Sequence, residues 1–138
     1  MADKQVVQVL DGFDNKAQAD RIAALIMPGE TLYLVFDCKG RGSGFIGVTD
    51  KRIIARDDGH RNKSIVSIPY SRIHAVGVDA NASWRGGSSF LSFSAGDDEW
   101  AFNFKGADKA RRAYQRIMEN LLDIERAPAS APVSAEAE

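Results

Sequence analysis

The residues best suited to chemistry lie in a glycine-rich stretch, K-G-R-G-S-G, which begins at Lys39. Lys39 and Arg41 would supply positive charge, and the glycines would let backbone N–H groups approach an anion such as phosphate. Arg52 follows the turn T-D-K and is a third cation able to bind an anion. These three residues form the candidate ligand site. The alternative for the first two is a solvated hairpin loop. For Arg52 it is an ion pair with Asp50 or Asp57, or a side chain whose apolar part lies over the sheet.

Residue types that carry catalysis or bind metals are few and scattered. Cys38 is the only cysteine, which excludes an intrachain disulfide and a Cys-based zinc site, and its apolar neighbours indicate a small core residue. Neither His60 nor His74 has a Cys, His or carboxylate partner at metal-ligand spacing. The chain has no nucleophile-elbow, Walker-type or zinc-protease motif. We therefore expect no enzyme activity, no metal and no cofactor.

A second group of candidates would act through protein contacts. Trp84 and Arg85 lie in a loop by composition, D-A-N-A-S-W-R-G-G-S, and Trp and Arg are favoured where a few residues dominate an interface. Trp84 could instead cover an open end of the chain's own fold. Ile22 and Ile26 belong to an apolar helical stripe, which could face a partner or pack on the rest of the chain. Both alternatives remain open from the sequence.

The first predicted element is a helix over residues 16–27, after an N-terminal segment, 1–14, of ambiguous structure. Asn15 and Gln18 have the spacing of a capping box, and Pro28–Gly29 ends the pattern. The apolar residues of the helix recur at intervals of three and four: Ala19, Ile22, Ala23 and Ile26.

From residue 31 to residue 105 the apolar period changes to that of strands. Turn signals separate seven short runs, and the clearest hairpin lies between Gly44 and Gly59. The predicted strands are 31–38, 45–49, 52–56, 64–70, 72–78, 90–93 and 99–105. This regular spacing indicates a sandwich or a barrel.

A long amphipathic helix follows over residues 107–126 and completes one domain, 15–126. Its apolar stripe consists of Ala110, Tyr114, Ile117, Leu121 and Ile124. Residues 127–138 are rich in Ala, Pro, Ser and Glu, and we expect a disordered tail.

Bulk properties fit one globular domain. The chain has 138 residues, 44% apolar residues and a formal net charge of −1, so no overall field would recruit nucleic acid. The N-terminus has no apolar run long enough for a signal peptide or a membrane span, and we expect a cytoplasmic protein.

The order and spacing of four segments resemble the pleckstrin-homology (PH) superfold, in particular bacterial PH-like domains of the YokE-like group. The segments are G-E-T-L, V-T-D-K-R-I-I, I-P-Y-S-R-I and F-N-F-K, and the resemblance covers roughly residues 15–125. It implies a mainly β fold, a seven-stranded and partly open antiparallel barrel capped by the C-terminal helix, with an N-terminal helix. In lipid-binding PH domains the loop after the first strand grips inositol phosphates, and Lys39 and Arg41 occupy the equivalent place.

Two functions fit these observations. The first is a non-catalytic binding or scaffold module that acts through protein–protein contacts, including contacts with itself, because an open barrel can add strands across subunits. Its partner would be a protein or a second copy, and not a nucleic acid. The alternative is a peripheral membrane or anionic-ligand module that uses Lys39 and Arg41, at only about 1 kcal/mol per basic residue.

Overall fold

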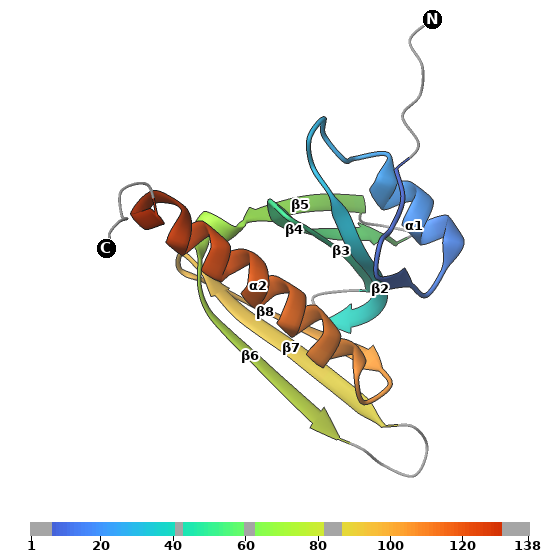
Figure 1. Ribbon diagram of the computed structural model, residues 1–138. Helices are drawn as coiled ribbons and strands as arrows, with labels where there is room; N and C mark the ends of the chain where they lie inside the picture. Colours follow the sequence, from blue (N-terminus) through green and yellow to red (C-terminus); the bar gives the residue numbers. More distant parts are fainter. Residues whose placement is uncertain (1–6, 41–42, 60–62, 82–86, 131–138) are drawn as a thin grey trace, which may run out of the picture.

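The computed structural model describes residues 7–40, 43–59, 63–81 and 87–130. Two α-helices and eight strands follow one another along the chain (Figure 1). In order these elements are β1 (Gly12–Phe13), α1 (Lys16–Ala23), β2 (Leu32–Gly40), β3 (Ser43–Thr49), β4 (Arg52–Asp58), β5 (Lys63–Pro69), the 3-10 turn η1 (Tyr70–Arg72), β6 (Ile73–Asn81), β7 (Ser88–Ala95), β8 (Asp98–Lys105) and α2 (Lys109–Ser130). The seven predicted strands correspond to β2–β8, and β1 is a two-residue addition that pairs parallel with β2.

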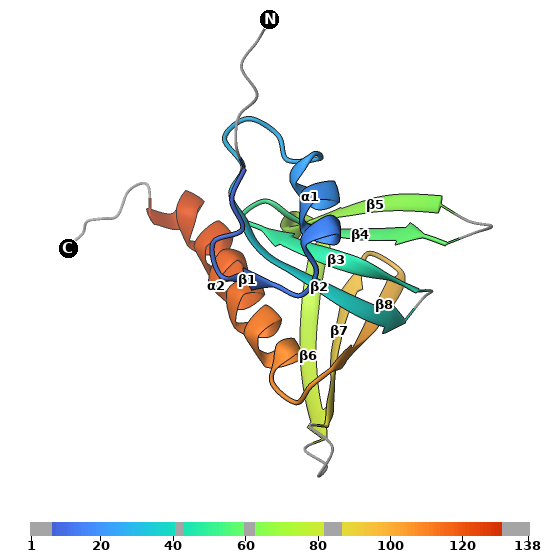
Figure 2. The same cartoon turned by 90° about the vertical axis from the view of Figure 1, so that its right-hand side faces the viewer.

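The strands form one hydrogen-bonded path in the order β5-β4-β3-β2-β8-β7-β6. Strands β2 and β8 pair only where Lys39 lies opposite Asn103 and Gly40 opposite Phe102. Because this junction is so short, the path splays into two layers, which Figures 1 and 2 show at a steep angle to each other. Strands β5 and β6 are the two ends of the path, so the barrel is not closed. The expected fold class, mainly β with a C-terminal capping helix and an N-terminal helix, is confirmed.

Helix α2 lies across the layer of β6, β7 and β8 (Figure 1). The buried residues of its stripe are Ala110, Ala113, Ile117 and Asn120, whereas Tyr114 and Leu121 are only partly buried. The buried face of α2 is therefore rotated, relative to the predicted apolar stripe, towards Ala110 and Ala113. The small side chains of these alanines let the helix approach the sheet closely. The helix also runs to Ser130, past the predicted end at residue 126.

Helix α1 covers the other layer, on the face away from α2 (Figure 2). Its Ile22 is fully buried in a second core with Leu32, Val35, Phe45 and Ile54. A Cβ on Gly47 would lie 2.6 Å from Ile22 Cγ2, so the glycine allows the helix to approach the sheet.

The helix begins as predicted, with the Asn15 side chain accepting a hydrogen bond from Gln18 N, but it ends at Ala23 rather than at Met27. The next residues form turns, and the carbonyl of Leu25 accepts a hydrogen bond from a side chain of β4, described below.

Candidate functional site

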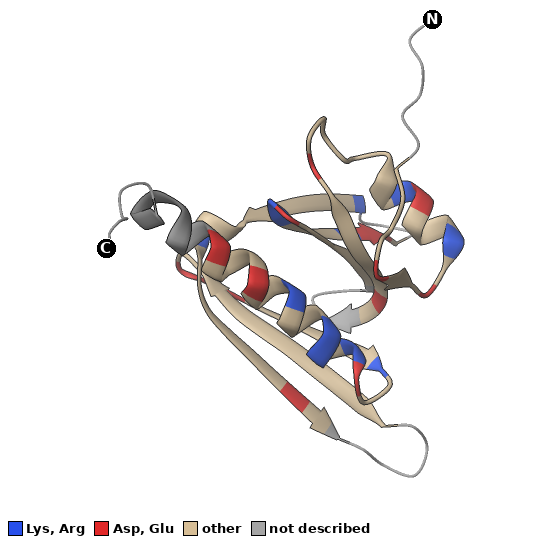
Figure 3. Cartoon of the chain, in the orientation of Figure 1, with Lys and Arg blue, Asp and Glu red and all other residues tan. Residues whose placement is uncertain are grey.

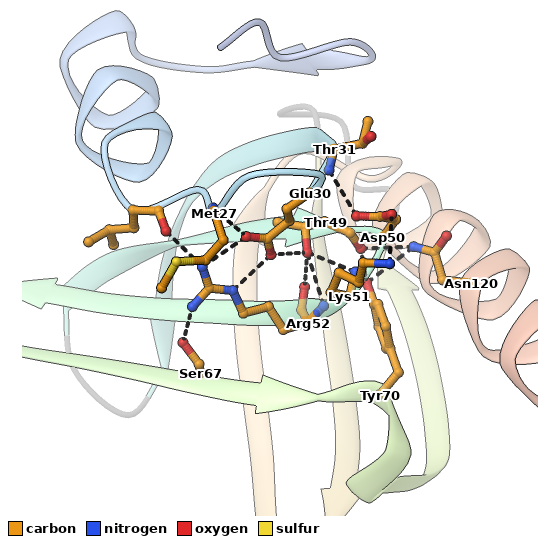
Figure 4. Close-up of polar contacts among 11 residues, drawn as sticks. Met27, Glu30, Thr31, Thr49, Asp50, Lys51, Arg52, Ser67, Tyr70 and Asn120 are labelled. Atoms are coloured by element: carbon orange, nitrogen blue, oxygen red, sulfur yellow. Dashed lines mark hydrogen bonds and ion pairs between the residues drawn. The ribbon is translucent and has the colours of Figure 1, made fainter. Parts of the chain in front are cut away.

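A polar cluster ties the turn after α1 to the ends of β3, β4 and β5 (Figure 4). Arg52 donates from Nε to Glu30 Oε2 at 2.8 Å and from Nη2 to Glu30 Oε1 at 2.9 Å, which is a two-point ion pair. The same guanidinium donates to Ser67 Oγ at 2.8 Å and to the Leu25 carbonyl at 2.7 Å. The side chains of Arg52 and Glu30 are only 17% and 3% exposed. The pair therefore joins three elements.

The environment of Glu30 favours its ionised form. Burial by itself would raise the pKa of this carboxyl, but hydrogen bonds from Arg52, Met27 N and Thr49 Oγ1, together with the Arg52 charge, lower the pKa to about 2. Thr49 Oγ1 in turn accepts from the backbone N–H groups of Lys51 and Arg52. Glu30 is thus an acceptor at the centre of the cluster, and nothing in this geometry makes it an acid–base catalyst.

Arg52 is paired with Glu30 and not with Asp50 or Asp57, the partners considered from the sequence. Asp50 instead accepts from the backbone N–H of Thr31 at 2.8 Å. An anion would have to displace Glu30 to reach the guanidinium, so the predicted ligand role of Arg52 stays a prediction.

The cluster continues to α2 through a buried carbonyl. Thr49 O accepts from Tyr70 Oη at 2.6 Å and from Asn120 Nδ2 at 2.9 Å (Figure 4). Burial raises the pKa of Tyr70, so its hydroxyl keeps the proton that it donates. Sequence reasoning missed Asn120. The available signal was a lone amide at helical spacing from Ile117, within an otherwise apolar face.

Gly44, the last residue of the glycine-rich stretch, lines a cavity of about 240 Å³ between the two layers. The cavity is lined by Cys38, Gly44, Phe45, Arg56, Trp100 and Phe102, among others. The backbone of Lys39 lies at the end of β2, opposite Ser43 and Asn103, whereas its side chain and all of Arg41 lie outside the described part of the chain.

Two residues that line this cavity, Arg56 and Cys38, are poorly suited to bind a ligand or to react. The guanidinium of Arg56 is held by Asp58 Oδ1 at 3.0 Å and the Arg21 carbonyl at 3.1 Å. Burial raises the pKa of the Cys38 thiol to about 12, so it is not a nucleophile at neutral pH.

The predicted protein-contact residues fall in two places. Trp84 and Arg85 lie outside the described residues. Ile22 and Ile26 both pack against the second core, which is the intrachain alternative left open by the sequence. A contact with a partner through Ile22 would require α1 to leave its own sheet.

Clusters of metal ligands are not found in the described ranges, where no three His, Cys, Asp or Glu side chains could hold an ion together. His74 Nε2 lies 3.1 Å from the Gly96 carbonyl, and His60 lies outside the described residues.

The edge of the path at β5 presents two neighbouring apolar side chains to solvent. Ile65 and Val66 are 50% and 37% exposed, and the segment Ser64–Ile68 contains no charged residue. Among the described strands β5 pairs with β4 alone. Its other edge therefore presents backbone N–H and C=O groups that another strand can pair with. Figure 3 shows this strand uncharged except at its beginning.

The fold of this chain is similar to that of a solved PH domain. The crystal structure of a pleckstrin homology domain from Shewanella amazonensis SB2B matches with a TM-score of 0.57 and 19% identity, over 79% of this chain and 99% of that one. The Vps36 N-terminal PH domain matches with a TM-score of 0.49 and 16% identity, over 70% of this chain and 86% of that one.

The chain belongs to the bacterial PH domain family, whose model, described as "Bacterial PH domain", matches residues 26–119. No curated protein matches the chain. The matched range includes β2–β8 and the first half of α2, and leaves α1 and the N-terminal segment outside it. PH domains are generally binding modules, and nothing in these comparisons points to enzymatic activity. The YokE-like group is not distinguished by the match and stays a prediction. None of the described helices is both long enough and apolar enough to cross a membrane.

Proposed function

We propose that this chain is a non-catalytic binding module that works through protein–protein contacts, and that the contact surface is the edge of β5 paired with β5 of a second copy. The single observation that carries this proposal is an edge strand with exposed Ile65 and Val66 and no charged residue in Ser64–Ile68. We also propose a cytoplasmic location, as expected from the sequence.

Edge strands of soluble proteins are usually protected by charges, prolines, bulges or covering elements. In β5 the protecting residues stand only at the ends, Lys63 at the start and Pro69 at the end. The pairing of β5 with β4 runs without a register shift from Arg52–Pro69 to Asp58–Lys63, so no bulge turns the edge away. The uncharged segment between the two ends is thus open to pairing.

Self-pairing has a defined register. A two-fold axis perpendicular to the sheet keeps each side chain on its own face of the sheet. Two residues that pair across the axis must therefore point to the same face, so their residue numbers are both even or both odd. If the axis passes at Val66, this residue lies opposite Val66 of the second copy, and Ser64 lies opposite Ile68. All five residues of Ser64–Ile68 would then pair with uncharged residues. If the axis passed at Ser64, Lys63 would lie opposite Ile65 of the second copy. This register is less favourable because the Lys63 side chain would lose part of its contact with water.

The experiment is light scattering coupled to size exclusion at two protein concentrations and two salt concentrations. The wild type should approach twice 15.0 kDa at the higher concentration in both salts, because the contact is apolar and made by the main chain. Val66→Lys should elute as a monomer. Val78→Lys is the matched control, because Val78 is 38% exposed on β6, the opposite end of the path, against 37% for Val66. A monomeric wild type, or an equal effect of the two variants, would refute the proposal.

A second candidate is binding of an anionic ligand or membrane headgroup at the glycine-rich stretch. The feature that favours it is the place of Gly44, which lines the cavity between the layers, directly after Lys39 and Arg41 in the sequence. The test is flotation with vesicles containing anionic lipid. Binding that is lost in Lys39→Glu and in high salt would support this second function, and no flotation of the wild type would exclude it.

A further inference from the structure

Residues 10–14, here called the strap, lie along the edge of β2 beside α2. Leu10 N donates to Leu32 O at 3.1 Å, Asp11 N to Tyr33 O at 2.8 Å, and Asp14 N to Val35 O at 3.2 Å. This edge of β2 is available because β8 pairs with β2 only at its far end, Lys39 and Gly40. The strap is therefore an added strand in the gap between β2 and α2.

Three basic residues of α2 face the strap. Lys109 Nζ lies 2.6 Å from Asp14 Oδ1, and Arg116 lies 2.9 Å from Asp11 Oδ2 through Nη2. Arg112 Nη2 donates to the Asp11 carbonyl at 2.9 Å. Figure 3 shows basic residues gathered on the first half of α2. Together the main chain of β2 and these cations form a groove in which the strap, with its two aspartates, lies extended.

Aromatic rings of β2 hold the same cations in place. Lys109 Nζ and the Arg112 guanidinium lie over the Phe36 ring, at 5.7 Å and 5.2 Å from its centre. The guanidinium of Arg116 lies 4.0 Å from the centre of the Tyr33 ring. These contacts do not involve the strap, so we expect them to hold the three cations in place when the strap leaves; Arg116 also keeps its ion pair with Glu119 at 2.8 Å.

One position of the groove selects glycine. Gly12 has a φ of +143°, and a Cβ built there would lie 2.9 Å from Arg112 Nη2. A larger residue would be strained and would push the guanidinium away from the carbonyl that it binds. With Asp11 before this glycine and Asp14 two residues after it, the strap carries the pattern Asp-Gly-x-Asp.

The strap is held mainly by polar contacts. Its two large apolar side chains, Leu10 and Phe13, are 57% and 46% exposed, so its release uncovers little apolar surface. We propose that the groove between β2 and α2 is a second binding surface, for an extended segment of a partner protein that carries Asp-Gly-x-Asp, and that this segment displaces the strap. The proposal does not depend on the pairing of β5.

The test uses the full chain and a fluorescent peptide, V-L-D-G-F-D-N, the sequence of residues 9–15. In Asp11→Asn/Asp14→Asn the strap loses its ion pairs while the groove is unchanged. This double variant should bind the peptide at least tenfold more tightly than the wild type, as measured by anisotropy. Arg116→Gln in the same background should weaken binding at least tenfold. Control peptides with Ala for the glycine, or Asn for both aspartates, should bind at least tenfold more weakly.

Three results would overturn the proposal. The first is no binding by the double variant when its thermal transition is intact, or by Asp14→Asn alone if the double variant fails to fold. The second is equal binding of the control peptides. The third is that the wild type and Val66→Lys are both dimers whereas Asp11→Asn/Asp14→Asn is a monomer. This result would indicate that the groove holds the strap of a second copy and not a segment of a foreign partner.

Discussion

Replacement of Glu30 by glutamine is expected to lower the free energy of unfolding by about 2 kcal/mol at pH 7. The pKa of this carboxyl falls from 4.5 to about 2 in the folded chain. Each tenfold change in an acid constant corresponds to about 1.4 kcal/mol, so the fall corresponds to about 3 kcal/mol. The Arg52 side chain is 17% exposed, and screening by water reduces the contribution to about 2 kcal/mol.

The sign of the pH dependence follows from the lowered pKa. The folded state binds the proton of Glu30 more weakly than the unfolded state, so the contribution is complete above pH 4.5 and is lost as the pH falls towards 2. The assay is urea denaturation of wild type and Glu30→Gln at pH 7, 4 and 2.5. The difference between them should shrink steadily over this series.

Asp20→Asn is the matched control for Glu30→Gln. Asp20 also pairs with a cation, Lys16, but the two side chains are 65% and 76% exposed, and we expect less than about 0.5 kcal/mol. A loss for Glu30→Gln as small as that of the control, or a loss that does not change between pH 7 and 2.5, would refute the reasoning about this ion pair.

Two further substitutions test the packing of the helices. Asn120→Asp would place a charge beside the buried Thr49 carbonyl in place of an N–H donor. Urea denaturation should show that the free energy of unfolding falls by about 3 kcal/mol at pH 7 and by less in acid, where the carboxyl is protonated. A loss that does not depend on pH would contradict this expectation. Gly47→Ala would place a Cβ 2.6 Å from Ile22 Cγ2 and should lower the free energy of unfolding by about 1–3 kcal/mol. In the control Gly77→Ala the nearest contact of the Cβ would be 3.3 Å, so the loss should be smaller. Equal losses would show that α1 does not pack as described.

Local patterns predicted the elements because each depends on neighbouring residues. The alternation of apolar residues identified β2–β8, and the spacing of Asn15 and Gln18 identified the start of α1. The exact face of α2 was not predictable in the same way. An apolar stripe does not reveal that alanines at 110 and 113 lie nearest the sheet, because that choice depends on how closely the two surfaces fit.

The polar contacts depend on tertiary position and had no local signal. An ion pair within its own hairpin was the alternative to the predicted ligand role of Arg52, yet its partner Glu30 lies 22 residues earlier, across the turn after α1. Asp11 and Arg116 are 105 residues apart, and in the sequence both looked like ordinary surface charges. The exposed edge of β5 could be suspected from S-I-V-S-I-P, but its place at the end of the path required the strand order.

The most direct test of the proposed function is disulfide crosslinking of Val66→Cys in the otherwise unchanged chain. Two-fold pairing about this residue brings the two introduced cysteines opposite each other, at a Cα separation of about 4.5–5.5 Å that a disulfide can span. The native Cys38 is buried and should not react. We expect Val66→Cys to form a covalent dimer under mild oxidation, and Val78→Cys and the wild type to remain monomeric on a non-reducing gel. A yield of dimer from Val66→Cys no greater than that from Val78→Cys would contradict self-association through β5.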